Sequence, residues 1–359
     1  MPCRPEKPQE SHDPPQHFLW SGAAFPGRGT GARDVVYHTA YPEASAVAVA
    51  GSPPRWLVVA DNEVPRLALF PLEPQSAKIH APALNAGTSP GYAVDDLEAI
   101  TVLPWDPNGD GRPEAVYHVL AASASRTKKG KVVAERDALL AVSTGADGKS
   151  FTPAAEVKIN RTLRAQLRAL GSENASQPWG PVLRDSVWAA GQNPDAPNAA
   201  LAGAAGLNIE GLSVSKDARA LLLGLRSPLV QGKALLIPLS NPVAALGLGG
   251  SAPQPAALAA PVLLDLGGLG FRSIEWDAER KSYLIAAGSA DDAKVFRFYT
   301  WTGDANAAPV AVKTESALAA AKLEPEGLTP VPGSKYTAVV GDGSAGAPFH
   351  AGIWVDFGP

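Results

Sequence analysis

The sequence predicts an all-β fold, a single β-propeller built of four-stranded antiparallel blades. Short apolar runs separated by Gly, Pro, Asn and Asp follow one another along the chain, which is typical of antiparallel strands. A short motif, Asn-Ile-Glu-Gly-Leu in its clearest form, recurs and begins each group of about four such runs. Two β-sandwiches are the alternative that this pattern leaves open.

The spacing of the repeated motif indicates the number of units. We call the residue in the position of its glutamate the anchor. It is a glutamate at three places, an arginine at one and, in a weak match, a serine; the anchors are Ser45, Glu98, Glu210, Arg272 and Glu326. The interval from Glu98 to Glu210 is about twice the others. We therefore favour five blades with one long insertion, and a sixth, degenerate blade is the alternative.

Composition limits the classes of function. The chain has 359 residues, of which 45% are hydrophobic, so it can bury a sizeable core. Its net charge of −4 provides no basic field for nucleic acid or an anionic membrane. No apolar run is long enough to predict a membrane span. No secretory signal is visible, so the compartment is periplasmic or extracellular if a signal was trimmed and cytoplasmic otherwise.

The N-terminal half is expected to hold two units and an insertion. Residues 1–15 are Pro-rich and polar, which predicts a disordered tail, and residues 16–359 form the propeller. Phe18–Ser21 is the expected strand that pairs the first blade with the last. The strands expected in the first two units are Ala46–Ala50, Trp56–Ala60, Arg66–Phe70, Ala77–His80, Leu97–Leu103, Ala115–Ala121, Ala138–Ser143 and Ala155–Ile159.

Residues 160–206 break the strand pattern and predict a helical and loop insertion. Leu163, Leu167 and Leu170 lie at helical spacing, and Gly171 follows them. Three further units come after it. Their expected strands are Ile209–Val214, Leu221–Leu225, Ala234–Leu239, Val262–Leu266, Arg272–Trp276, Ser282–Ala287, Val295–Trp301, Val310–Thr314, Gly327–Val331, Tyr336–Val340 and Ala351–Asp356.

Several segments together resemble a known family. They are Asp96–Ile100, Asn208–Leu212, Gly224–Leu229, Leu269–Ile274 and Pro325–Leu328. In combination they resemble an uncharacterised bacterial domain-of-unknown-function family, which is similar to propellers with the esterase-like activity of phytase. The resemblance spans about residues 41–343 and implies a propeller without implying a reaction. The Ser-His-Ser segment of the family corresponds here to Ser123-Ala124-Ser125. The histidine is missing, which weakens a hydrolase interpretation.

One loop has the pattern of a calcium site. Oxygen ligands at positions 1, 3, 5 and 9, a backbone carbonyl at 7 and a glycine at 6 are typical of Ca²⁺ loops. The residues in the ligand positions are Asp106, Asn108, Asp110, Arg112 and Glu114. Tyr117 replaces the glutamate that closes an EF-hand, so the loop instead resembles the calcium hairpins of integrin-type propellers. The sequence predicts a structural calcium ion; an Asp/Asn/Gly turn without metal is the alternative.

The anchors predict a polar site on the propeller axis. The inner strands of a propeller surround the axial channel, so Glu98, Glu210, Glu326 and Arg272 are expected to converge there. The ends of the second strands add a second group at one mouth of the channel. That group is Asp61, Arg126, Arg226 and Asp342. The alternative is a ring of structural ion pairs.

Two functions fit these observations. In the first, Arg126, Arg226 and Arg272 bind a small anionic ligand, with Glu98, Glu210 or Glu326 as general base or metal ligand in a metal-dependent esterase or phosphoesterase. In the second, the propeller is a non-catalytic scaffold that presents its face or its insertion to a protein partner.

Overall fold

The computed structural model describes residues 35–39, 44–62, 67–72, 92–127, 130–145, 148–187, 203–291, 293–313, 323–343 and 350–357. For residues 35–39, 71, 342–343 and 350–356 it describes the backbone alone. The predicted tail 1–15, the predicted strand Phe18–Ser21 and the predicted strand Ala77–His80 lie outside the described residues.

The described strands form five antiparallel sheets, four of them with four strands and one with three. The first sheet is β2 (Ala44–Ala50), β3 (Trp56–Asp61) and β4 (Leu67–Pro71). The second is β5 (Leu97–Trp105), β6 (Ala115–Ala122), β7 (Leu139–Ser143) and β8 (Ile159–Asn160). The third is β9 (Asn208–Val214), β10 (Leu221–Ser227), β11 (Ala234–Leu239) and β12 (Val262–Leu264). The fourth is β13 (Gly270–Asp277), β14 (Ser282–Gly288), β15 (Phe296–Trp301) and β16 (Val310–Val312). The fifth is β17 (Leu323–Pro330), β18 (Tyr336–Gly343), β19 (His350–Asp356) and β1 (Val35–Thr39).

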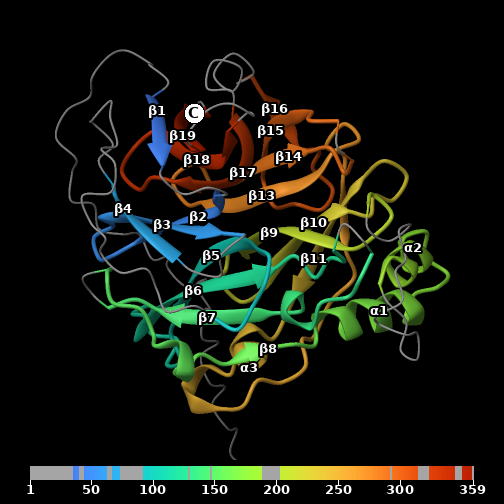
Figure 1. Cartoon of the computed structure of the whole chain (residues 1–359), viewed down its shortest axis with the longest axis horizontal. Coiled ribbons are helices and arrows are strands. Elements are labelled where there is room, and N and C mark those ends of the chain that lie inside the picture. Colours follow the sequence, from blue (N-terminus) through green and yellow to red (C-terminus); the bar gives the residue numbers. More distant parts are fainter. Residues whose placement is uncertain are drawn as a thin grey trace, which may run out of the picture.

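The sheets are arranged in a ring (Figure 1). One strand of each sheet, called its inner strand here, contacts the inner strand of the next sheet. The inner strands are β2, β5, β9, β13 and β17, and β17 in turn contacts β2. Inside each sheet the strands follow one another in sequence order, apart from β1. A closed cycle of antiparallel sheets around a common centre is a β-propeller, and this confirms the predicted fold class.

The last sheet is completed by a strand from the N-terminal part of the chain. β1 pairs antiparallel with β19, with Val36 opposite Ile353. As predicted, a strand from the N-terminal part of the chain pairs with the last sheet, but this strand is Val35–Thr39. This segment, Val-Val-Tyr-His-Thr, is rich in the β-branched and aromatic residues that favour strands.

Every inner strand contains a β-bulge at its anchor residue. The register of each inner strand against its neighbour skips one residue of the inner strand, and in the third sheet a second shift follows on β10. The residues skipped are Ser45, Glu98, Glu210, Arg272 and Glu326. A bulge redirects a side chain without ending the strand. The repeated motif therefore marks the place where each inner strand bends.

The small residue that follows each anchor has a packing reason. At Gly327 an added Cβ would lie 2.7 Å from the Cα of Ala46, on the inner strand of the neighbouring sheet. The equivalent positions are all small, namely Ala46, Ala99, Gly211 and Ser273. The aliphatic residue that comes next is buried in every unit: Val47, Ile100, Leu212, Ile274 and Leu328.

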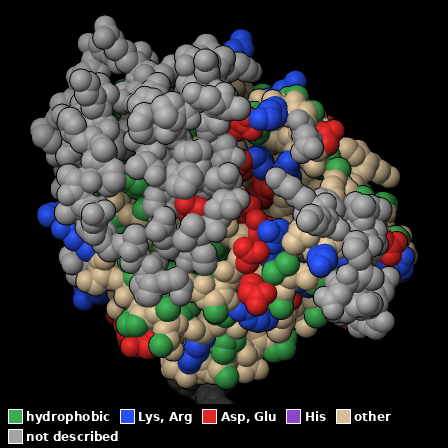
Figure 2. All heavy atoms as spheres, in the orientation of Figure 1, with side chains coloured by type: hydrophobic (Ala, Val, Ile, Leu, Met, Phe, Trp, Pro, Cys, Tyr) green, Lys and Arg blue, Asp and Glu red, His purple; other side chains and the backbone are tan. Residues whose placement is uncertain are grey.

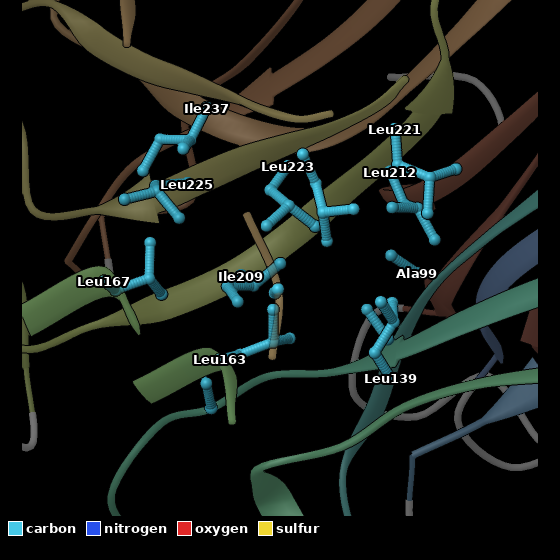
Figure 3. Close-up of a cluster of buried hydrophobic side chains, with 14 of the residues drawn as sticks. Ala99, Leu139, Leu163, Leu167, Ile209, Leu212, Leu221, Leu223, Leu225 and Ile237 are labelled. Atoms are coloured by element: carbon cyan, nitrogen blue, oxygen red, sulfur yellow. The ribbon is translucent and has the colours of Figure 1, made fainter. Parts of the chain in front are cut away.

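Two helices of the insertion pack against the second and third sheets. They are α1 (Leu163–Glu173) and α2 (Trp179–Ser186), and they contact each other. Leu163, Leu167 and Leu170 lie on one buried face, as their spacing predicts. Figure 3 shows Leu163 and Leu167 directed toward Ile209 and Leu225, in a cluster that also holds Leu183 of α2. The helices therefore extend the core between two sheets.

The remaining described helices are short. They are α3 (Pro242–Leu246) and the 3-10 turns η1 (Ala134–Arg136), η2 (Ala154–Glu156) and η4 (Leu248–Gly250). The predicted strand Ala155–Ile159 is not a strand over most of its length: its first two residues belong to η2, which follows Pro153, and only its last residue pairs, as part of β8 (Ile159–Asn160). Within the ranges given above, no helix is long and apolar enough to span a membrane.

The contact at Gly327 yields a stability prediction. Replacing Gly327 with alanine is expected to lower the free energy of unfolding by about 1–3 kcal/mol, because the new methyl group meets backbone that cannot move aside. Gly203→Ala is the matched control, since nothing lies within 4 Å of its added Cβ. Chemical denaturation measures both. Equal stability of the two variants would contradict this account of the motif.

Candidate functional site

The anchors of three sheets form a chain of buried ion pairs. Glu210 accepts hydrogen bonds from Arg226 Nη1 at 3.0 Å and from Arg272 Nη1 at 2.6 Å. The other terminal nitrogen of Arg272 pairs with Glu326. Burial alone would lower the pKa of Arg272, but the carboxylates of Glu210, Glu326 and Glu98 raise it above its ordinary value. Arg272 is therefore a permanent cation that joins the third, fourth and fifth sheets.

Glu98 differs from the other acidic anchors. Its exposed fraction is 8%, and within the described part of the chain its carboxyl group makes no hydrogen bond or ion pair. Burial, and then the charges of Asp96, Glu210 and Glu326, raise the pKa of Glu98 well above its ordinary value, with only a partial offset from Arg272. The protonated form of Glu98 is thus favoured.

The charges of the site balance when Glu98 is neutral. Two guanidinium groups, those of Arg226 and Arg272, form ion pairs with two carboxylates, those of Glu210 and Glu326. A third buried carboxylate with no added cation would be repelled by the other two. The fold therefore places one carboxylic acid beside a neutralised ion-pair cluster.

A second polar network adjoins Glu98. Asp96 accepts hydrogen bonds from the hydroxyl groups of Ser123 and Ser125, and it pairs with Arg136 Nη1 at 3.0 Å. Arg136 also binds Asp95 through Nε at 2.9 Å. Burial raises the pKa of Asp96, although Arg136 opposes the shift. Sequence analysis missed Asp96 and Arg136 as site residues; the acidic pair just before the anchor Glu98 is the signal that could have indicated them.

A second layer of polar residues lies three positions beyond the anchors. Glu275 Oε1 accepts hydrogen bonds from Thr101 Oγ1 at 3.1 Å and from Ser213 Oγ at 3.3 Å. These residues come from the fourth, second and third sheets, so they meet across the axis. Burial raises the pKa of Glu275 to about 8, despite these hydrogen bonds. Sequence analysis missed this layer too, although Thr101, Ser213, Glu275 and Thr329 share one motif position.

The predicted group at the channel mouth is only partly assembled. Arg226 joins the ion pairs through Glu210, and its side chain is 23% exposed. Asp61 is buried at the end of β3, opposite Ala44. Asp342 lies opposite Glu324 in the backbone register, and its side chain is outside the description.

The contacts of Arg126 are with a neighbouring loop and with the helical insertion. Its Nη1 donates to Gly130 O at 2.8 Å, and it lines a pocket beside α2 with Arg164. β6 ends at Ala122, and Arg126 then pairs with Val132 in an isolated antiparallel bridge. The contacts of Arg126 in the described structure are therefore with this bridge and with the pocket wall.

The predicted calcium loop is exposed and closed by its own hydrogen bonds. Asp106 Oδ1 accepts from Gly109 N at 2.8 Å and Asp106 Oδ2 from Gly111 N at 2.7 Å. Asn108 Nδ2 donates to Glu114 Oε1 at 2.7 Å across the loop. In the residues that the structure describes, no group of three His, Cys, Asp or Glu side chains is placed to hold a metal ion.

Charged side chains gather in the middle of the face shown in Figure 2. Acidic and basic groups lie beside one another there, over the centre of the ring seen in Figure 1. Elsewhere on the visible part of this face the charges are more scattered. This distribution agrees with a polar site on the propeller axis.

Comparison with known proteins adds little about function. Residues 200–327 match a family described as "Protein of unknown function (DUF3616)", which covers less than half of the chain. No protein of curated function matches. Among solved structures the chain is similar to the β-propeller domain of Myceliophteria thermophila Cps50 (Swd1), with 11% identity and a TM-score of 0.35 over 87% of this chain and 83% of that one. The fold assignment therefore rests on the strand pairing, and the chemistry rests on the site.

Glu275 makes stability dependent on pH. The folded protein holds its proton up to a pKa of about 8, whereas an unfolded glutamate releases it near 4.5. The stabilisation is therefore fully present below the unfolded pKa and is lost as pH rises through the folded one. We expect the free energy of unfolding to fall by about 3 kcal/mol between roughly pH 5 and pH 8.

Glu275→Gln tests the origin of this loss. The amide imitates the neutral acid, so the variant is expected to be more stable than the original protein near the upper end of that range. The exposed Glu173→Gln serves as the control. Thermal unfolding across the pH range measures all three proteins, and an unchanged pH slope in Glu275→Gln would show that another group titrates.

Proposed function

We propose that the protein binds a small anionic ligand at the mouth of its axial channel, between the carboxyl group of Glu98 and the guanidinium of Arg226. The observation that carries this proposal is the state of Glu98, a buried carboxyl group without a hydrogen bond in the described structure. A buried polar group that lacks a partner is costly, so a ligand that accepts its proton in a hydrogen bond would stabilise it.

The two arginines have different roles in this proposal. Arg272 uses its two terminal nitrogens on Glu210 and Glu326, so it positions these carboxylates. Arg226 makes one ion pair, donates to the carbonyl of Ser289 at 2.9 Å, and remains partly exposed. Its exposed edge is the cation that a ligand from solvent would meet first.

The same geometry supports ester or phosphoester hydrolysis. Protonated Glu98 can act as general acid: its proton moves to the leaving oxygen as the bond to the acyl carbon or phosphorus breaks. Water supplies the new oxygen, and the proton that this water loses restores the acid form of Glu98. Glu210 and Glu326 are held by Arg272 and would orient the cluster rather than accept a proton. The resemblance to esterase-like phytase propellers leaves the reaction open, and alanine at position 124, in place of the histidine between the two serines, weakens the hydrolase interpretation.

Anion binding is tested by calorimetric titration with sulfate at several pH values, because the charge of sulfate is the same at all of them. Sulfate affinity is expected to fall as pH rises and Glu98 ionises. In Glu98→Gln the affinity should become independent of pH, because the amide keeps a donor that does not titrate. Arg226→Gln should weaken binding about tenfold.

An affinity that rises with pH would instead indicate a cationic ligand attracted to ionised Glu98. Hydrolysis is tested separately with a panel of phosphomonoesters and carboxylic esters. Activity that survives in Glu98→Gln would exclude Glu98 as the acid. Absence of both binding and activity would favour the second function, a scaffold whose ion pairs only join neighbouring sheets.

We also infer that the ring has five blades. The three-stranded sheet β2–β4 is the fifth, because β2 contacts both β17 and β5 and so occupies a full place in the cycle.

A calcium ion in the loop 106–114 is a further part of the proposal. Asp106 turns both oxygens inward, and Asn108 and Glu114 face each other. Calcium is expected to raise the melting temperature of the original protein, and the increase should be lost in Glu114→Gln. Glu156→Gln, outside the loop, is the control. An equal response of all three proteins would exclude this loop as the site.

A further inference from the structure

Two serine hydroxyl groups meet at one carboxylate oxygen beside the axial ion pairs. Ser123 and Ser125 follow the end of β6, and both donate to Asp96 Oδ2, the second of them at 3.2 Å. Their hydroxyl oxygens are 2.8 Å apart. Ser123 is fully buried, whereas Ser125 is half-buried. Ser125 is therefore the hydroxyl group of this pair that a molecule from solvent can reach.

The backbone that presents these hydroxyl groups is strained. Ala124 has a φ of 56° and Asp96 a φ of 62°, in the left-handed region that residues with a Cβ rarely adopt. Backbone hydrogen bonds hold both residues in place: Ser123 N donates to Asp96 O at 2.9 Å, and Ala124 N donates to Arg136 O at 2.9 Å. Strained backbone of this kind gathers at catalytic and binding sites, where the surrounding structure fixes it.

Arg136 has donor capacity left beside Ser125. Its Nη1 donates to Ser125 Oγ at 3.1 Å and pairs with Asp96, and its Nε pairs with Asp95. Within the described part of the chain its other terminal nitrogen, Nη2, makes no hydrogen bond. A cationic donor next to a nucleophile can stabilise the negative charge that develops on a carbonyl oxygen under attack.

The carboxyl group of Glu98 adjoins this network. After burial, the charge of Asp96 is the largest cause of the raised pKa of Glu98, so the two carboxyl groups lie close together. Arg136 and the serine hydroxyl groups favour the ionised form of Asp96. A hydroxyl group, a carboxylate and a carboxylic acid therefore lie side by side, and carboxyl groups in different protonation states can act as base and acid.

We propose that Ser125 is the nucleophile of a carboxylic esterase and that Asp96 is its general base. This inference rests on the proposed function, because Glu98 remains the acid of the same site. Ser125 Oγ bonds to the acyl carbon while its proton passes to Asp96, and Glu98 protonates the alcohol oxygen as its bond to the acyl carbon breaks. Water then attacks the acyl carbon and gives its proton to Glu98. Asp96 returns the first proton to Ser125 Oγ as the acyl–serine bond breaks.

The probe is p-nitrophenyl acetate, because its leaving group departs without help from an acid. The full chain is exposed to it briefly, quenched in acid and mapped by peptide mass spectrometry. A burst of p-nitrophenolate and an acetyl group on Ser125 are expected. Ser125→Ala should lose both. The exposed Ser172→Ala, on α1, is the matched control and should retain both.

Asp96→Asn tests the base, because the amide keeps the shape of the side chain but cannot take a proton from Ser125. The acetylation rate should fall at least about a hundredfold, with the melting temperature as the check on folding. In the original protein the rate should rise with pH as Asp96 ionises and then level off, a step that Asp96→Asn should lose. The exposed Asp265→Asn should keep both the rate and the pH profile.

Failure of this inference can be told apart from failure of the proposed function. Sulfate binding by the original protein without acetylation would overturn the nucleophile alone. Acetylation without sulfate binding would support the nucleophile and contradict the anion site. Glu98→Gln should be acetylated but release acetate more slowly, because no carboxylate takes the proton of the attacking water. An equal burst in Ser125→Ala, a label on other residues only, or an unchanged rate in folded Asp96→Asn would each overturn the proposal.

Discussion

The burial of Arg272 is the constraint on which the centre of this propeller depends. A guanidinium group removed from water is very costly unless carboxylates surround it with good geometry. Glu210 and Glu326 provide that geometry from the two neighbouring sheets. Because each partner belongs to a different sheet, the inner strands can approach one another only in one register. The ion pairs thus contribute to the specificity of the ring, and loss of one partner would leave an unpaired buried charge.

The β-bulges explain how charged side chains reach the axis at all. A regular strand alternates its side chains between two faces, and in a propeller both faces pack on neighbouring sheets. An extra residue at each anchor breaks that alternation and leaves one side chain outside the packing. Three residues later a second polar layer forms around Glu275. The channel is therefore polar at two levels while the aliphatic residues between them stay in the core.

Much of the fold could be predicted because it is repeated. The motif at Glu98, Glu210, Arg272 and Glu326 is short, but its recurrence with strands between is enough to indicate a ring and a meeting of its anchors. Features that occur once could not be predicted in this way. The network of Asp96 and Arg136 depends on how one strand ends. The pocket at Arg126 depends on one hairpin and one insertion. The raised pKa of Glu275 follows from burial, which the sequence does not state.

The pairing of β1 with β19 has a consequence for how the protein is made. Ribosomes deliver the chain from its N-terminus, so β1 emerges before any strand of the sheet it will complete. Until β19 is synthesised, the N-terminal strand has no partner and exposes its backbone groups to other chains. Closure of the ring therefore has to wait until β19 has been synthesised, and during that interval the open sheet is at risk of aggregation.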